Sequence, residues 1–246
     1  MASSAPLLRL EGASRRRAGR CAVAALDLKL ERGEVLGLLG VNGAGKSTTL
    51  ALIAGALRPD AGRVLLDGRD LAEHPQVTRR LLGWLPERVP LWPELTVDEH
   101  LTAHARLRGL RGRALTHACA DMLARLALGP LARRLAGVLS QGQRQRLGLA
   151  CALVHRPALV LLDEPANALD PVQQVALRRL VREEAARGAG VILSTHLLSE
   201  VTATCDRVAI LHEGTLRHDA PLAAGDEAAL ERHFFAIAVA GEARAA

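Results

Sequence analysis

The segment GVNGAGKS, residues 40–47, restricts the fold of this chain more than any other stretch. It matches the pattern G-x-x-x-x-G-K-[ST] and lies between an apolar run, EVLGLLG, and a helix-like stretch, STTLALIAGAL. In that context the glycines let backbone N–H groups curl around phosphate oxygens, Lys46 reaches the β- and γ-phosphates, and the Ser47 hydroxyl ligates Mg²⁺. The segment therefore predicts a phosphate-binding loop between a strand and a helix. A glycine-rich turn with a surface lysine is the alternative.

The cation at residue 46 supports the phosphate loop. Arginine supplies almost all of the basic charge, and only Lys29 and Lys46 are lysines. A compact ammonium fits between phosphates, where a planar guanidinium would crowd the loop. One of the chain's two lysines thus lies at the position where phosphate binding favours lysine over arginine.

Two later strand-like runs end in side chains suited to phosphate chemistry. Residues 159–165, LVLLDEP, end in Asp163, which can hold Mg²⁺, and Glu164, which can orient or deprotonate an attacking water. Residues 191–196, VILSTH, end in His196, which can contact the γ-phosphate or that water. Taken alone, the first run could equally be a buried strand that ends in acidic residues, and His196 in the second run could be a structural histidine.

The segment LSQGQ, residues 139–143, has the pattern of a helix start. Ser140 and Gln143 are spaced as a capping box, in which each side chain satisfies a backbone N–H of the first turn. Gly142 lies in that turn, and no carboxylate does, so the helix start is also suited to an anion. The pattern alone leaves open whether Ser140 caps the helix or binds a phosphate.

Strand-like and helix-like segments alternate along the chain. Strand-like runs cover residues 6–12, 24–30, 34–40, 63–68, 83–87, 158–165, 191–196 and 207–214, whereas residues 96 to about 155 are helical in character. A further helix is expected at Asp170-Pro171, an N-cap followed by proline at the first helical position. The alternation predicts an α/β fold with a parallel-cored sheet and an inserted helical subdomain. The alanine-rich last 20 or so residues carry no pattern.

Composition excludes several classes of protein. Hydrophobic residues make up 49% of the 246, which excludes a disordered chain. No apolar run reaches the roughly 18 residues that span a bilayer. The first residues carry their charges after the apolar patch, so we expect no secretory signal. The four cysteines lie far apart with no CxxC pair, so we expect reduced thiols in the cytosol.

Two clusters of side chains allow more than one interpretation. The net charge is +6, and the basic residues 15–17 and 20 are either solvated surface or a patch for nucleic acid or anionic lipid. His100 and His104 are spaced i, i+4 with His117 nearby, so they are either a two-histidine metal site or a solvated helix face. The missing HExxH pattern favours the solvated face.

Together, the order of these segments resembles the nucleotide-binding subunit of ABC transporters over about residues 6–220, with LSQGQ as the counterpart of the family's LSGGQ. The resemblance implies an ABC-type P-loop NTPase core at about 1–87 and 157–220. It also implies an N-terminal antiparallel β subdomain, a helical subdomain at about 88–156, and a short tail at 221–246. The first 220 residues would form one domain.

The resemblance also implies ATP and Mg²⁺ as cofactors and a role for each matching residue. Two subunits would pack head to tail around ATP, which acts as glue between them and whose hydrolysis releases them. The catalytic residues would be Glu164 and His196. Mg²⁺ would be held by Ser47, Asp163 and Glu87. The nucleotide would contact the loop residues Gly40, Asn42, Gly43, Ala44, Gly45, Lys46, Ser47 and Thr48 of one subunit, and Ser140, Gly142, Gln143 and Asp170 of the other.

The chain departs from the family pattern at several positions. Glu87 stands where glutamine is usual, and Gln141 replaces a glycine. Ala166 and Ala168 replace threonine and glycine. The aromatic residue that stacks on adenine should fall near residue 18, but the chain has no tyrosine, so we expect Arg17 or Arg20 to cover the base. These changes predict weaker or less base-selective nucleotide binding.

Within the family, residues 83–110 resemble the ATPase subunits of ABC-2-type exporters, among them multidrug, gliding-motility and copper-enzyme-maturation systems. This implies a motor at the cytoplasmic face of the membrane, with residues 87–101 facing a permease on a separate chain and no nucleic acid partner. The alternatives are a non-hydrolysing regulatory subunit in a heterodimer and a soluble ABC ATPase of translation or DNA repair.

Overall fold

The computed structural model describes residues 5–17, 19–167, 169–223 and 227–245. A six-stranded sheet lies at its centre, with the strand order β10-β9-β3-β8-β7-β6. Five of its strands are parallel and β10 is antiparallel to β9. This confirms the predicted α/β fold with a parallel-cored sheet. The strands are β3 (Val35–Leu39), β6 (Leu82–Leu85), β7 (Leu159–Asp163), β8 (Gly190–Thr195), β9 (Arg207–His212) and β10 (Thr215–Pro221).

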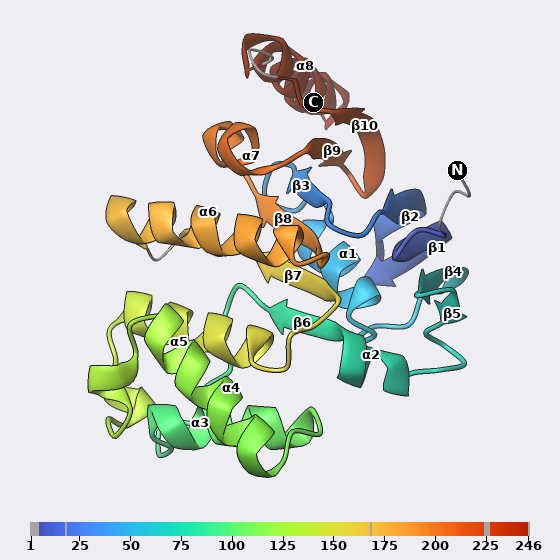
Figure 1. The fold of residues 1–246 in the computed structure, drawn as a ribbon. Helices are drawn as coiled ribbons and strands as arrows, with labels where there is room; N and C mark the ends of the chain where they lie inside the picture. Colours follow the sequence, from blue (N-terminus) through green and yellow to red (C-terminus); the bar gives the residue numbers. More distant parts are fainter. Residues whose placement is uncertain (1–4, 18, 168, 224–226, 246) are drawn as a thin grey trace.

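The apolar runs of the sequence form the inner strands of this sheet. Every residue of β3, β7 and β8 is buried. Parallel strands are covered on both faces, so they require continuous rather than alternating hydrophobicity. The helices that cover the sheet include α1 (Lys46–Ile53), α6 (Pro171–Ala186) and α7 (Leu198–Thr204) (Figure 1).

A second sheet is built from the N-terminal third of the chain. It is antiparallel, has the order β2-β1-β4-β5, and packs into one apolar cluster with α1 and the inner strands. This confirms the predicted N-terminal β subdomain. Its strands are β1 (Leu8–Arg17), β2 (Arg20–Leu30), β4 (Ala61–Leu66) and β5 (Arg69–Asp70), and a short helix, α2 (Gln76–Leu81), leads from it to β6.

Residues 97–153 form the helical insert, which lies below the sheet in Figure 1. It begins with a complete capping box at Thr96 and Glu99, as the sequence predicts. Its buried side chains form one cluster with the underside of β7 and α6, so the insert is packed onto the core. Its elements are α3 (Val97–Leu107), α4 (Gly112–Arg125), the 3₁₀ turns Gly129–Leu131 and Ala136–Val138, and α5 (Gln141–Leu153).

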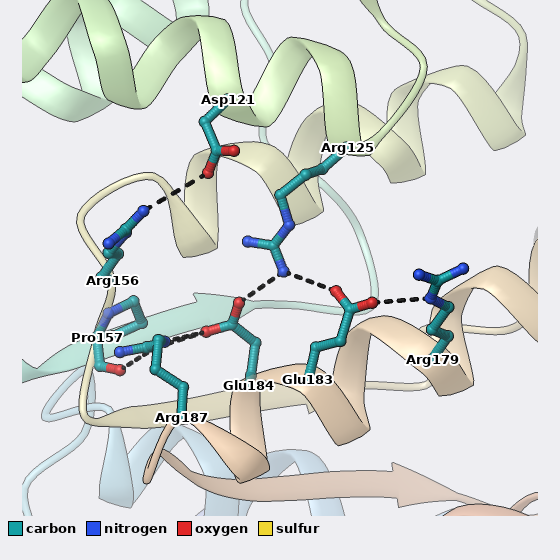
Figure 2. A network of polar contacts seen from close by, with 8 residues as sticks. All are labelled: Asp121, Arg125, Arg156, Pro157, Arg179, Glu183, Glu184 and Arg187. Carbon is teal, nitrogen blue, oxygen red and sulfur yellow. Dashed lines mark hydrogen bonds and ion pairs between the residues drawn. The ribbon is translucent and has the colours of Figure 1, made fainter.

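A polar network joins the insert to the core beside this apolar contact. Figure 2 shows Arg125 of α4 between two carboxylates of α6, with its Nη2 3.2 Å from Glu183 Oε2 and 3.0 Å from Glu184 Oε1. The Glu184 side chain is only 5% exposed and is also bound by Arg187, whose Nη2 donates to the Pro157 carbonyl. A buried carboxylate with two guanidinium partners is satisfied rather than strained.

The C-terminal residues are more ordered than their composition suggests. α8 (Glu227–Ala245) covers residues that show no pattern in the sequence. Leu230 is buried against Leu39, Val201 and Ile210 beneath it. Among the described residues, no helix is both long and apolar enough to cross a membrane.

The histidines of α3 differ from the solvated face that the sequence favours. His100 is fully buried, its ring stacks on Trp92 at 5.8 Å, and its Nε2 lies 2.9 Å from the Trp92 carbonyl oxygen. Burial is also the main cause that lowers the pKa of His104. The i, i+4 spacing does place His100 and His104 on one face of α3. His100 on that face packs against Trp92, in the segment before the helix, rather than facing solvent.

Candidate nucleotide site

Four loops meet at one edge of the central sheet. They follow β3, β8, β7 and β6, which are consecutive neighbours and parallel. Parallel neighbours present their carboxyl ends at the same edge, where open α/β sheets bind ligands. The phosphate-loop residues, His196, Glu164 and Glu87 therefore converge, although the sequence separates them widely.

A cavity of about 400 Å³ lies at this edge. The predicted residues that line it are Asn42, Gly43, Ala44, Gly45, Lys46, Ser47, Thr48, Glu87, Glu164 and His196. Ala22, Val41 and Asn167, which are not among the predicted residues, also line it.

The glycines of the loop are required by its geometry. Gly43 and Gly45 have φ angles of 81° and 107°, a region that side chains disfavour. A Cβ on Gly45 would also lie 2.5 Å from the Ala22 carbonyl oxygen. Gly45 is the N-cap of α1, whose first turn has no acidic residue, so the helix start presents free N–H groups to the cavity.

Lys46 is buried in the cavity wall with its charge partly matched. Its Nζ donates to the Gly40 carbonyl at 2.6 Å and lies 3.5 Å from Glu164 Oε1. The other carboxylate oxygen of Glu164 lies 2.9 Å from His196 Nδ1. The side chains of Lys46, Glu164 and His196 thus form a continuous series of polar contacts across the cavity.

Glu164 reaches this position from a strained turn. Its φ is 47°, which is unusual for a residue with a side chain. Its amide donates to the Ser194 carbonyl and hydroxyl oxygens, each at 3.1 Å. The Ser194 hydroxyl in turn donates to Asp163 Oδ1, so one buried serine on β8 holds both acidic residues at the end of β7.

Ser194 carries no signal in the sequence, because its partners lie about 30 residues away on another strand.

Asp163 stands behind the cavity rather than in its lining. It is buried, and its Oδ1 is taken by Ser194. The oxygens of Ser47, Asp163 and Glu87 are the hard donors that Mg²⁺ prefers, and Mg²⁺ commonly takes one or two carboxylates plus substrate phosphates. These residues fit that ion. The described residues contain no group of three or more His, Cys, Asp or Glu side chains that could hold a metal by themselves.

Ser140, Gly142 and Gln143 lie outside the cavity. Ser140 is exposed at the start of α5, where it accepts from the Gln143 amide at 3.3 Å while the Gln143 side chain accepts from the Ser140 amide at 3.0 Å. The capping box is therefore present within the single chain. Asp170 likewise caps α6, accepting from the Gln173 amide at 2.9 Å, as the sequence predicts for that helix.

The expected cover for the adenine is not part of the cavity lining. Arg17 and Arg20 are exposed at the end of the β1–β2 pair. Residues 18 and 168, the positions of two departures from the family pattern, lie outside the described residues.

Comparison with known proteins identifies the family. The family model for ABC transporters matches residues 23–167. The chain belongs to the ABC transporter family. This confirms the predicted family, fold class and ATPase class, and it supports ATP as the nucleotide.

Relatives with similar sequences carry transport names. The chain is 40% identical over 195 residues to the probable multidrug ABC transporter ATP-binding protein YbhF of Escherichia coli, covering 79% of this chain and 34% of that protein. It is 34% identical over 197 residues to the bacitracin transport ATP-binding protein BcrA of Bacillus licheniformis, covering 80% of this chain and 63% of that protein. The chain thus spans about a third of the first relative and under two thirds of the second.

Solved structures agree in fold. One described as the ATP-binding subunit of an ABC transporter superposes with a TM-score of 0.84 at 32% identity, covering 93% of this chain and 94% of that one. The dimeric cassette MJ0796 has a TM-score of 0.81 at 23% identity, covering 88% of this chain and 99% of that one. The second likeness concerns the fold alone.

Proposed function

We propose that this ABC ATPase is the motor subunit of an ABC-2-type exporter, in which closure of a head-to-tail dimer on MgATP drives a separate permease. The observation that carries the proposal is the chain of contacts from Lys46 through Glu164 to His196 across the phosphate cavity. A regulatory subunit that does not hydrolyse ATP has no need of a base held in this way.

Hydrolysis would begin from this arrangement. The ammonium of Lys46 would turn from Glu164 to the β- and γ-phosphates, which frees the carboxylate. Glu164 would then accept a proton from water as its oxygen attacks the γ-phosphorus and the bond from that phosphorus to the ADP oxygen breaks. His196, oriented by Glu164, would donate to the γ-phosphate. Mg²⁺, held by Ser47, Asp163 and Glu87, would neutralise charge on the phosphates.

The position of Ser140 supports a dimer. It is exposed, it caps a helix whose first turn has no acidic residue, and it is not part of the lining of its own chain's phosphate cavity. A second copy in head-to-tail orientation would bring this helix start to the γ-phosphate, with Gly142, Gln143 and Asp170 at the same interface. A heterodimer with a related ATPase would use the same surface.

The segment at residues 87–101 is suited to contact the permease. It contains Trp92, whose side chain is 56% exposed, and it leads from Glu87 at the cavity to α3. A large exposed aromatic residue is typical of a protein contact. The multidrug and bacitracin transport names of the two relatives favour an exporter, and the subunit would then lie at the cytoplasmic face of the membrane.

Turnover by the purified chain tests the proposal. We expect Mg²⁺-dependent ATP hydrolysis that falls at least a hundredfold in Glu164→Gln, because the amide cannot accept the proton, while nucleotide binding is retained. Nucleotide binding without turnover in the unsubstituted chain would support the regulatory alternative instead. Stimulation by RNA or DNA at physiological salt would favour the nucleic acid alternative.

A further inference from the structure

Gln145 joins the helical insert to the loop that carries Glu164. It lies on α5 and is 5% exposed. Its side-chain Nε2 donates to the Pro165 carbonyl at 3.0 Å. A buried amide that bonds a backbone carbonyl 20 residues away fixes the two segments relative to each other.

The bonded carbonyl belongs to the residue directly after Glu164. The strained φ of 47° at Glu164 persists only if the surrounding structure holds it. Ser194 holds the amide of Glu164 on one side. Gln145 holds the carbonyl of the next residue, Pro165, one peptide further along, so hydrogen bonds restrain the backbone on both sides of Glu164.

Gln145 also shares a helix with Ser140. The two residues lie about 7.5 Å apart along the helix axis, at 1.5 Å per residue. A hydrogen-bonded helix turn is stiff, so a shift of its first turn moves Gln145 as well.

We propose that Gln145 is a positioning residue for Glu164, and that it couples the grip of Ser140 on the partner's nucleotide to the base of its own chain. This inference rests on the proposed function. ATP bound in the neighbouring subunit's cavity would fix the position of the start of α5. Through its hydrogen bond to the Pro165 carbonyl, Gln145 would then restrain the backbone at Glu164.

Other contacts hold the insert to the core, so removing this bond leaves the fold intact. Arg125 bridges to Glu183 and Glu184 as in Figure 2, and Arg108 Nη1 donates to the carbonyls of residues 78 and 79. The apolar cluster beneath α5 is independent of the amide. Methionine at position 145 would fill a similar volume without a donor.

The experiment compares Gln145→Met with Arg146→Met in the full chain. Arg146 is the next residue of α5 and also donates to backbone carbonyls, but those belong to residues 126 and 127 within the insert. We expect kcat to fall about tenfold in Gln145→Met with the KM for ATP nearly unchanged, because a small displacement of the base slows chemistry without removing phosphate contacts. We expect Arg146→Met to keep the kcat of the unsubstituted chain within about twofold.

A double-substitution cycle with Glu164→Gln separates positioning from a general effect. If Gln145 acts through the carboxylate, adding Gln145→Met to Glu164→Gln lowers the residual single-turnover rate less than twofold. Additive losses, or equal kcat values for Gln145→Met and Arg146→Met, would overturn the role of Gln145 alone. Undiminished turnover in Glu164→Gln would overturn the proposed function, and this inference with it.

Discussion

At the scale of single residues, Ser194 connects the two acidic residues of the site through its hydroxyl. It is fully buried, and its hydroxyl serves the Glu164 amide and Asp163 Oδ1 together. Ser194→Ala would leave the Asp163 carboxylate buried without that donor. We expect it to lower the free energy of unfolding by about 1–3 kcal/mol, the cost of an unsatisfied buried polar group.

Denaturant unfolding of Ser194→Ala and Ser199→Ala provides the measurement and its control. Ser199 is exposed and carries the same substitution, so its stability should stay within about 0.5 kcal/mol of the unsubstituted chain. Equal stabilities for the two variants would show that the hydrogen bond to Asp163 contributes nothing to folding.

The residues that could be predicted from the sequence are those whose chemistry repeats in a local pattern. Lys46 belongs to a glycine loop, and Glu164 and His196 each follow an apolar strand; all three line the cavity, and their roles stay predictions. Ser194 and Gln145 form hydrogen bonds with residues 20 or more positions away in the sequence. No local sequence pattern predicts such long-range pairs. The adenine contact also stays a prediction, because Arg17 and Arg20 do not line the cavity.

At the scale of elements, His155 makes the junction of α5 and β6 sensitive to acid. Its Nε2 lies 3.1 Å from the Leu82 carbonyl oxygen. Burial, with Arg108 nearby, lowers the pKa of His155 from 6.5 to about 4. The folded state therefore favours the neutral form of the His155 ring. Its contribution to stability is complete above the unfolded pKa of 6.5 and is lost as the pH falls toward about 4.

Unfolding free energies between pH 7.5 and 4.5, measured for the unsubstituted chain and His155→Gln, test this effect. Glutamine keeps a donor for the Leu82 carbonyl and cannot be protonated. We expect the unsubstituted chain to lose at most about 3 kcal/mol more than the variant over this range, at 1.36 kcal/mol per pKa unit. Parallel pH curves for the two proteins would contradict a buried neutral His155.

Elements with strong end signals were predictable, and elements that depend on tertiary contacts were not. The capping boxes at Thr96 and Ser140 and the Asp170-Pro171 start all occur where the sequence places them. The helix α8 was not predicted from its alanine-rich sequence, and its Leu230 packs against Leu39 and Ile210 of the core. The buried face of α3 was misjudged for the same reason, since Trp92 covers His100 from outside the helix.

At the scale of the whole molecule, the architecture separates two helix starts whose first turns have no acidic residue. Gly45 at α1 faces its own cavity, whereas Ser140 at α5 faces solvent from the insert. The apolar cluster and the network of Figure 2 fix the insert on the core. The two helix starts therefore lie apart within one chain, and the proposed head-to-tail dimer would bring one subunit's Ser140 to the other subunit's cavity.

Light scattering during size-exclusion chromatography of Glu164→Gln, with and without MgATP, tests the dimer most directly. We expect a monomer without nucleotide and a dimer with MgATP. Adding Ser140→Arg should abolish the dimer because the bulky cation fills the helix start, whereas Thr116→Arg, at an exposed position of α4, should leave it intact. A monomer under all conditions despite measured ATP binding, or a dimer insensitive to Ser140→Arg, would contradict the account.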